Sequence, residues 1–183
     1  TPLCQSDRLI KQLLDRVPQL IDDLESKGVQ YTNVMPARAD LDSGQGRSWQ
    51  NTLGSKSKAS AERRLRELDY TWEWLQGENL KVTTPVLTAT RLLADGRKVF
   101  FNQLIAAYRG WKDSRNKDSK KIQFGDGSDI SEESMEVVCE IAENITYDHF
   151  WQKGDLLLVD NFLVMHGRRP FVGTRKVLAS LSI

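Results

Sequence analysis

One histidine and three arginines lie close together near the C-terminal end of the sequence, beside runs of apolar residues. His166 follows the apolar stretch 162–165, and Arg168 and Arg169 come almost directly after it. Arg175 stands nine residues after the histidine, just before a further apolar run. A neutral imidazole can bind iron, zinc or copper, and a planar guanidinium fits a carboxylate through paired hydrogen bonds. The combination suggests a metal ligand beside a clamp for a carboxylate.

The neighbouring apolar runs predict the strands that would position these side chains. The run 156–159 follows a Gly-Asp turn and is long enough for a strand buried on both faces. The runs 162–165 and 177–181 predict two further strands, so that the polar side chains lie at the mouths of adjacent strands. Residue type alone leaves two other interpretations open, a structural histidine and arginines on a solvent-exposed rim.

This pattern resembles the C-terminal signature of the iron(II)/2-oxoglutarate dioxygenases, specifically the taurine dioxygenase and clavaminate synthase-like family and its plant members in particular. The signature residues are Asp160, Asn161, His166, Gly167, Arg168, Pro170, Phe171 and Arg175. Further similar motifs follow in order along nearly the whole chain: Trp49, 98–102, 106–108, Gly110 with Trp111, 124–127 and 151–155. Each motif alone is weak, but the ordered set is specific.

The resemblance implies an oxygenase that uses iron(II), 2-oxoglutarate and O2, and releases succinate and CO2. His166 would bind the iron, Arg175 would pair with the distal carboxylate of 2-oxoglutarate, and Arg168 would support that carboxylate or its loop. Lys176 competes with Arg175, because a shift of one residue in strand register exchanges the two. Some members that use sulfonates carry a second arginine where this chain has Ala179, which argues against a taurine-like substrate.

Three further residues are site candidates. Thr1 matches a threonine that helps to hold 2-oxoglutarate in the family, and the alternative is an ordinary terminal residue. Asn102 and Gln103 follow a predicted strand, where their amides could orient a substrate. The alternative is that they form hydrogen bonds with loop backbone.

The family's iron site also needs a His-x-acidic pair on an earlier strand. The sequence has two histidines, and the residue two positions after His149 is Trp151 rather than an acid. The chain also begins at Thr1 without a methionine. We therefore expect residues 1–183 to be the C-terminal portion of a single dioxygenase-type domain, with the pair further upstream. Otherwise the chain as written does not assemble a three-ligand site.

The remaining segments predict a fold that is mainly β with flanking helices, a double-stranded β-helix (jelly roll) lacking its N-terminal part. An Asp95-Gly96 turn predicts a hairpin between the apolar segments on either side of it. The other predicted elements are a helix from Ser6 or Asp7 that restarts at Pro18 and ends at Gly28, a strand at 29–34, a long loop at 36–60, a helix at 60–68, strands around Trp72 and Trp74 and at 82–86, and a helix after Asp129 or Ser131.

Composition indicates one globular domain, because 39% of the residues are hydrophobic and 28% are charged. The 26 Lys and Arg residues balance the 25 Asp and Glu residues, so no net charge draws the chain to nucleic acid or an anionic membrane. The basic run 63–66 is interleaved with glutamates, which predicts a solvated helix face. No apolar run approaches the roughly 18 residues of a membrane span.

The two cysteines, Cys4 and Cys139, are far apart in the sequence and lack a CxxC partner. This spacing argues against a zinc site or a disulfide framework and is compatible with a reducing compartment, the alternative being one disulfide between them. We expect a cytoplasmic protein with a small-molecule substrate, and neither nucleic acid nor a membrane as a partner. The sequence does not indicate the oligomeric state.

Three hypotheses about function follow. The first is the iron(II)- and 2-oxoglutarate-dependent oxygenase. The second is a non-catalytic jelly-roll binding domain, suggested by the missing metal-binding pair. The third is another metal enzyme, such as an isomerase of the cupin type.

Overall fold

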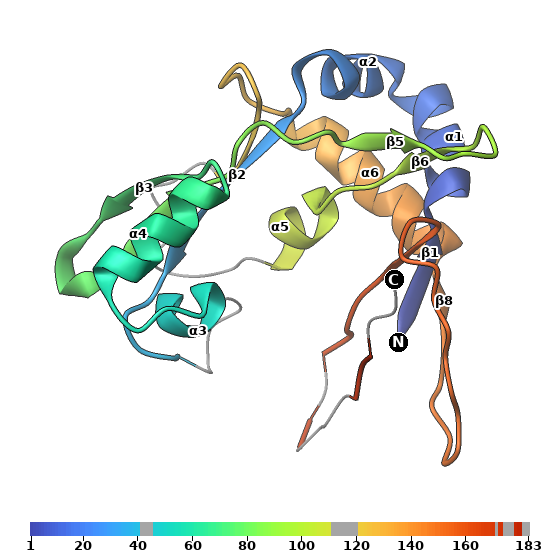
Figure 1. Ribbon diagram of the computed structural model, residues 1–183. Helices are drawn as coiled ribbons and strands as arrows, with labels where there is room; N and C mark the ends of the chain where they lie inside the picture. Colours follow the sequence, from blue (N-terminus) through green and yellow to red (C-terminus); the bar gives the residue numbers. More distant parts are fainter. Residues whose placement is uncertain (41–45, 111–120, 171, 174–177, 181–183) are drawn as a thin grey trace.

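The computed structural model in Figure 1 describes residues 1–40, 46–110, 121–170, 172–173 and 178–180. Its helices are α1 (Ser6–Arg16), α2 (Pro18–Lys27), α3 (Trp49–Leu53), α4 (Lys58–Glu67), α5 (Leu104–Gly110) and α6 (Glu132–Ile145), with a 3-10 turn, η1 (Gln76–Glu78). Its strands are β1 (Pro2–Gln5), β2 (Val29–Met35), β3 (Thr71–Trp74), β4 (Leu80–Thr83), β5 (Thr90–Leu92), β6 (Lys98–Phe100), β7 (Ile122–Phe124), β8 (Tyr147–Asp148) and β9 (Val164–His166).

The described strands form three antiparallel sheets, with the orders β8-β1-β9, β3-β4-β2-β7 and β5-β6. The fold is thus a mixture of helices and antiparallel sheets, with more helix than the sequence predicted. This arrangement is consistent with a taurine dioxygenase-type fold. The described strands belong to three small sheets, so the jelly roll stays a prediction. The missing N-terminal part also stays a prediction.

The larger hydrophobic core lies where α1 packs against α6 and the β5-β6 hairpin (Figure 1). It forms because the apolar stripes of the helices face inward. As predicted, Pro18 opens α2, and Gly28 ends it with a positive φ of 69°. The buried side chains that define this core include Leu9, Ile10, Leu13, Leu20, Ile21, Leu24, Val29, Tyr31, Phe100, Leu104, Met135, Val138 and Ile141.

A smaller core lies under α3 and α4 and contains Met35, Trp49, Ala61, Leu65, Leu80 and Val82. Trp49 is only 4% exposed and meets Trp74 edge to face, with 5.2 Å between ring centroids. Trp49 therefore anchors part of the segment predicted as a loop at 36–60, and it begins a short helix that the sequence analysis missed. Strand β2 joins the two cores, since Tyr31 belongs to the larger one and Met35 to the smaller one.

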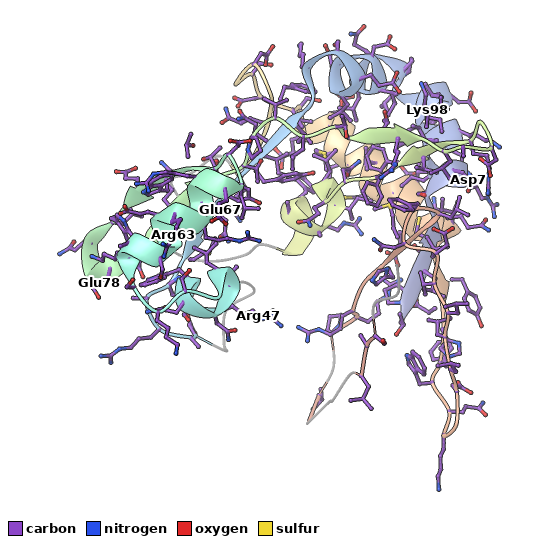
Figure 2. The ribbon with its side chains drawn as sticks, in the orientation of Figure 1. Asp7, Arg47, Arg63, Glu67, Glu78 and Lys98 are labelled. Carbon is purple, nitrogen blue, oxygen red and sulfur yellow. The ribbon has the colours of Figure 1, made fainter. Side chains whose placement is uncertain are left out.

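Local signals in the sequence placed several elements correctly. The hairpin across Asp95-Gly96 forms as predicted, with Arg91 opposite Val99. Ser131 caps α6 by accepting a hydrogen bond from the backbone of Ser134. Charged pairs run along the solvent side of α4, and Figure 2 shows Arg63 and Glu67 projecting from it. The prediction of a solvated face is therefore confirmed.

The predicted N-cap of α1 is wrong. Gln5 is the N-cap residue and no side chain caps the helix. Ser6 is instead fully buried, and its hydroxyl hydrogen points at the carbonyl oxygens of Phe162 and Leu163, 2.8 and 2.9 Å away. A local capping rule could not anticipate this use, because the partners lie more than 150 residues along the chain.

The buried strand predicted at 156–159 is also wrong. The segment between β8 and β9 extends away from the helices (Figure 1), and residues 154–160 form no strand. Leu156 and Leu158 are each 94% exposed. An apolar run is buried only where other elements cover it, and the described part of the chain places none there. Of the strand predicted at 177–181, residues 178–180 are described, and they are exposed and form no strand, so the prediction is wrong for this part of the segment.

Both cysteines, Cys4 and Cys139, are free and buried, which rules out the disulfide alternative. Burial raises the pKa of each thiol, so both are held as unreactive neutral groups. In the described residues, the helices are all too short or too polar to cross a bilayer.

Candidate functional site

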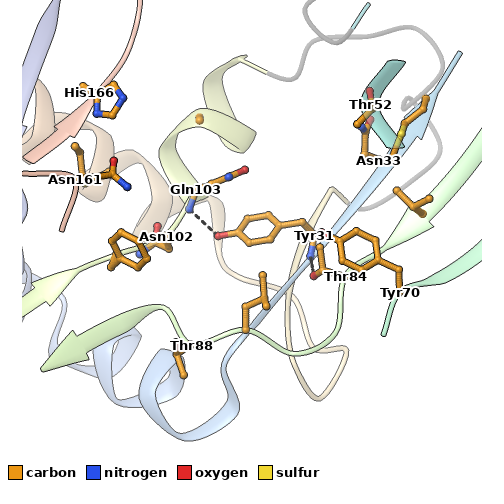
Figure 3. Close-up of a pocket in the computed structure, with 16 residues that line it drawn as sticks. Tyr31, Asn33, Thr52, Tyr70, Thr84, Thr88, Asn102, Gln103, Asn161 and His166 are labelled. Carbon is orange, nitrogen blue, oxygen red and sulfur yellow. Dashed lines mark hydrogen bonds between the residues drawn. The ribbon is translucent and has the colours of Figure 1, made fainter. Parts of the chain in front are cut away.

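His166 ends β9 and faces a cavity of about 830 Å³. The strand is held in register by pairing with β1, where Leu3 lies opposite His166 and the Gly167 N–H donates to the Pro2 carbonyl at 3.3 Å. Within the described part of the chain, the imidazole has no hydrogen-bond or ion-pair partner. The side chain is exposed and borders the cavity, so it is available to an ion or molecule bound there (Figure 3).

The cavity lies between the two hydrophobic cores and is bounded by β2, β4, the 84–88 segment, the start of α5 and the 161–166 segment. Its volume suits a small molecule. The wall mixes apolar and aromatic groups with neutral hydrogen-bonding groups. The described lining residues are Tyr31, Asn33, Met35, Thr52, Tyr70, Val82, Thr84, Leu87, Thr88, Phe101, Asn102, Gln103, Ala106, Asn161, Met165 and His166.

The structure separates the two amide candidates, although both border the cavity. The Asn102 side chain donates to the Ala89 carbonyl at 2.8 Å and accepts from the Leu104 N–H at 3.0 Å. These bonds favour the structural interpretation for Asn102. Gln103 uses its backbone N–H, which donates to the Tyr31 hydroxyl at 3.0 Å, and its side-chain amide remains at the cavity wall (Figure 3).

Thr1 lies one step beyond the β1-β9 ladder and is absent from the described cavity wall. Its hydroxyl oxygen accepts from the Trp151 indole N–H at 2.7 Å, and its carbonyl accepts from the His149 N–H at 2.8 Å. The hydroxyl keeps its own proton for donation. A contact between Thr1 and a carboxylate therefore stays a prediction.

The arginines after His166 differ in their surroundings. Arg168 is exposed, whereas Arg169 is half-buried and bridges two carboxylates. Its Nε lies 3.1 Å from Asp148 Oδ1, and its Nη2 lies 2.9 Å from Asp148 Oδ2 and 2.8 Å from Glu143 Oε1. Arg175 falls outside the described residues. The predicted clamp is therefore neither supported nor opposed by the structure, and the same holds for its competitor Lys176.

Arg169 was missed by the sequence analysis because its partners precede it by 21 and 26 residues. The hydrogen bonds that it donates, and secondarily its positive charge, lower the pKa of both Asp148 and Glu143, and the same bonds raise the pKa of the guanidinium. The network fixes the segment after β9 to β8 and to the end of α6. Arg169 thereby holds the backbone that carries His166.

The described residues do not make a complete metal site. No three His, Cys, Asp or Glu side chains gather closely enough in this part of the chain to hold an ion. The other histidine, His149, has its Nε2 at 3.1 Å from Asp155 Oδ2 and is absent from the described cavity wall. In the described residues, one imidazole, that of His166, lies at the cavity, and its role as an iron ligand stays a prediction.

These features, a strand-end histidine at a small-molecule cavity in a fold of helices and antiparallel sheets, are consistent with a dioxygenase domain. The sequence matches the family described as "Taurine catabolism dioxygenase TauD, TfdA family" over residues 1–181, and the chain belongs to this family. The resemblance noted from its motifs is therefore confirmed.

Two curated relatives show the same affiliation. The chain is 36% identical over 182 residues to the clavaminate synthase-like protein At3g21360 of Arabidopsis thaliana, covering 99% of this chain and 55% of that protein. It is 28% identical over 193 residues to the dapdiamide synthesis protein DdaC of Enterobacter agglomerans, covering 99% of this chain and 56% of that protein. The chain thus spans about half the length of the curated relatives it matches.

Proposed function

We propose that the protein is an iron(II)- and 2-oxoglutarate-dependent oxygenase that oxidises a small molecule and releases succinate and CO2. Membership of a dioxygenase family supports the general class. The observation that carries the proposal is the imidazole of His166, which faces a cavity of about 830 Å³ and has no partner among the described residues. Because the exposed imidazole is not tied to another protein group there, it is available to bind an ion or a molecule in the cavity.

In this proposal His166 supplies one nitrogen ligand, and residues outside 1–183 supply the remaining ones. Bound iron would activate O2 in the presence of 2-oxoglutarate. Arg175 pairs with the distal carboxylate of the cosubstrate, Arg168 supports it, and the Thr1 hydroxyl donates to a carboxylate oxygen. Arg169 acts one step away, because its bonds to Asp148 and Glu143 fix the backbone on which His166 and Arg168 stand.

The test uses the full-length protein of the native reading frame. Addition of iron(II) and 2-oxoglutarate without oxygen should give a visible charge-transfer absorption, and admission of air should release succinate. His166→Ala should abolish both signals. The matched control is His149→Gln, which removes the other imidazole, leaves the described cavity wall intact and should keep both signals.

Three outcomes separate this proposal from its competitors. Absence of both the absorption and succinate in the full-length protein rejects it. Ligand binding that survives a chelator and the His166→Ala change indicates a non-catalytic binding domain. Metal-dependent turnover without 2-oxoglutarate indicates a different metal enzyme.

A further inference from the structure

Two carboxamides line the cavity from separate segments of the chain, in company with His166 (Figure 3). Gln103 stands just before α5, and Asn161 lies in the turn before β9. Neither side-chain amide has a hydrogen-bond partner among the described residues, in contrast to Asn102. Each amide therefore has a donor and an acceptor available for a ligand.

The backbone of Gln103 is held in place from β2. The Tyr31 hydroxyl accepts the Gln103 N–H at 3.0 Å, and Tyr31 is 5% exposed. Burial raises the pKa of this phenol to about 12, so its hydroxyl stays neutral at ordinary pH. Asn102 caps the start of α5 beside it. The Gln103 side chain thus projects from a fixed point.

The turn that carries Asn161 is held from two sides. Asp160 Oδ1 accepts from the backbone N–H of Phe162 at 2.9 Å and that of Leu163 at 3.3 Å. On the other side, the buried hydroxyl of Ser6 and its backbone N–H both reach the Leu163 carbonyl, at 2.9 and 2.8 Å. Asn161 therefore stands on a turn that hydrogen bonds fix from both sides.

The segments that carry Gln103 and Asn161 are in contact with each other. Phe101 comes two residues before Gln103 and Phe162 comes directly after Asn161, and the centroids of their rings lie 5.2 Å apart. The Arg91 guanidinium covers Phe162 at 4.3 Å from the ring centroid. Aromatic packing thus joins the two segments that carry the carboxamides, and such preorganisation favours specific recognition.

We propose that Gln103 and Asn161 form a recognition pair for an uncharged amide or ureido group of the substrate. A carboxamide ligand offers both a donor and an acceptor, so it satisfies both side chains without a charge. A carboxylate or ammonium group would gain no opposite charge from the pair, since both side chains are neutral. The apolar lining residues Met35, Val82, Leu87 and Met165 suit an apolar body for the rest of the ligand.

The inference depends on the proposed function in one respect, which is that the compound bound by the pair is the one that the enzyme oxidises. Its test needs neither iron nor 2-oxoglutarate. The probes are 3-phenylpropanamide, 3-phenylpropanoate, 3-phenylpropylamine and 3-phenylpropan-1-ol, which share one apolar body. Each is titrated into the chain in the presence of EDTA, with the side-chain NH2 signals of Gln103 and Asn161 followed by NMR.

We expect the amide to bind at least about tenfold more tightly than the other three probes and to shift both NH2 signals. Gln103→Leu and Asn161→Leu should each weaken its binding about tenfold, because a ligand group is left unpaired. Gln103→Glu is nearly isosteric and introduces a negative charge, so this variant should bind the amine more tightly than the amide. Asn144→Leu, on the exposed side of α6, is the matched control and should change nothing.

Equal or tighter binding of the acid, the amine or the alcohol overturns the inference, as does an amide affinity that the Leu and Glu variants leave unchanged. The two proposals also fail separately. Amide binding through the pair without succinate release rejects only the oxygenase. Succinate release without an amide preference rejects only the recognition pair.

Discussion

Arg169 and Asp148 face each other through a two-pronged pair, in which Nε lies 3.1 Å from Oδ1 and Nη2 lies 2.9 Å from Oδ2. Asp148 belongs to β8 and Arg169 follows β9, and these strands flank β1 on opposite sides. The pair therefore bridges the two outer strands of the sheet that carries His166.

We predict that Arg169→Gln lowers the thermal midpoint and loosens the segment after β9, because Asp148 and Glu143 lose their shared cation. Arg169→Lys should recover only part of the loss, since an ammonium cannot make the two-pronged pair. Thermal unfolding followed by circular dichroism measures both. Arg63→Gln, on the exposed face of α4, is the control, and an equal loss there would contradict the prediction.

The same network predicts a dependence of stability on pH. Arg169 holds the pKa of Asp148 and Glu143 below the ordinary values. A carboxyl with a lowered folded-state pKa stabilises the fold above its unfolded pKa, and this stabilisation disappears as pH falls through the folded value. The free energy of unfolding of the wild type, measured with urea, should therefore decrease below about pH 4. In Arg169→Gln it should decrease less over the same pH range. Parallel pH profiles would contradict it.

Ser6→Ala should destabilise the protein by about 1–3 kcal/mol, because it removes the hydrogen bond that a fully buried hydroxyl donates to a carbonyl near the other end of the chain. The carbonyl concerned is that of Phe162, which accepts from the Ser6 hydroxyl at 2.8 Å. Urea unfolding measures the change. Ser26→Ala is the matched control, since that exposed hydroxyl bonds only within its own helix, and its effect should stay within about 0.5 kcal/mol.

Gly125→Ala should lower the free energy of unfolding by about 1–3 kcal/mol, because an added methyl group has no room. A Cβ at this position would collide with the Lys27 carbonyl and the Val86 side chain. Gly110→Ala is the comparison, because a Cβ there meets no described atom within 4 Å. A similar loss in both variants, measured by chemical denaturation, would contradict the steric explanation.

Elements with local signals could be predicted from the sequence. Pro18 and Gly28 bound α2, and Asp95-Gly96 turns the hairpin, because backbone geometry at these positions depends on neighbouring residues alone. The segment 156–159 was predicted wrongly because burial of a strand depends on distant covering elements. Ser6 was assigned a local role for the same reason, although it serves a turn near the other end of the chain.

The candidate site divides in a similar way. The motif placed His166 correctly beside a cavity, because strand and histidine are adjacent in the sequence. Asn102 and Gln103 have the same side-chain chemistry, and only the structure separates the satisfied amide from the available one. Arg169 was overlooked, since nothing in its local sequence reveals Asp148 and Glu143.

Strand β2 has one further consequence for the cavity. Its first half packs in the larger core with α1, α2 and α6, and its second half packs in the smaller core with α3 and α4. The cavity lies between the two cores. The smaller assembly has fewer apolar neighbours to lose, so it should loosen first under mild denaturant. Amide hydrogens of β4 near Val82 should then exchange with solvent sooner than those of α1. The cavity would open on the side of the smaller core while its opposite wall stays folded.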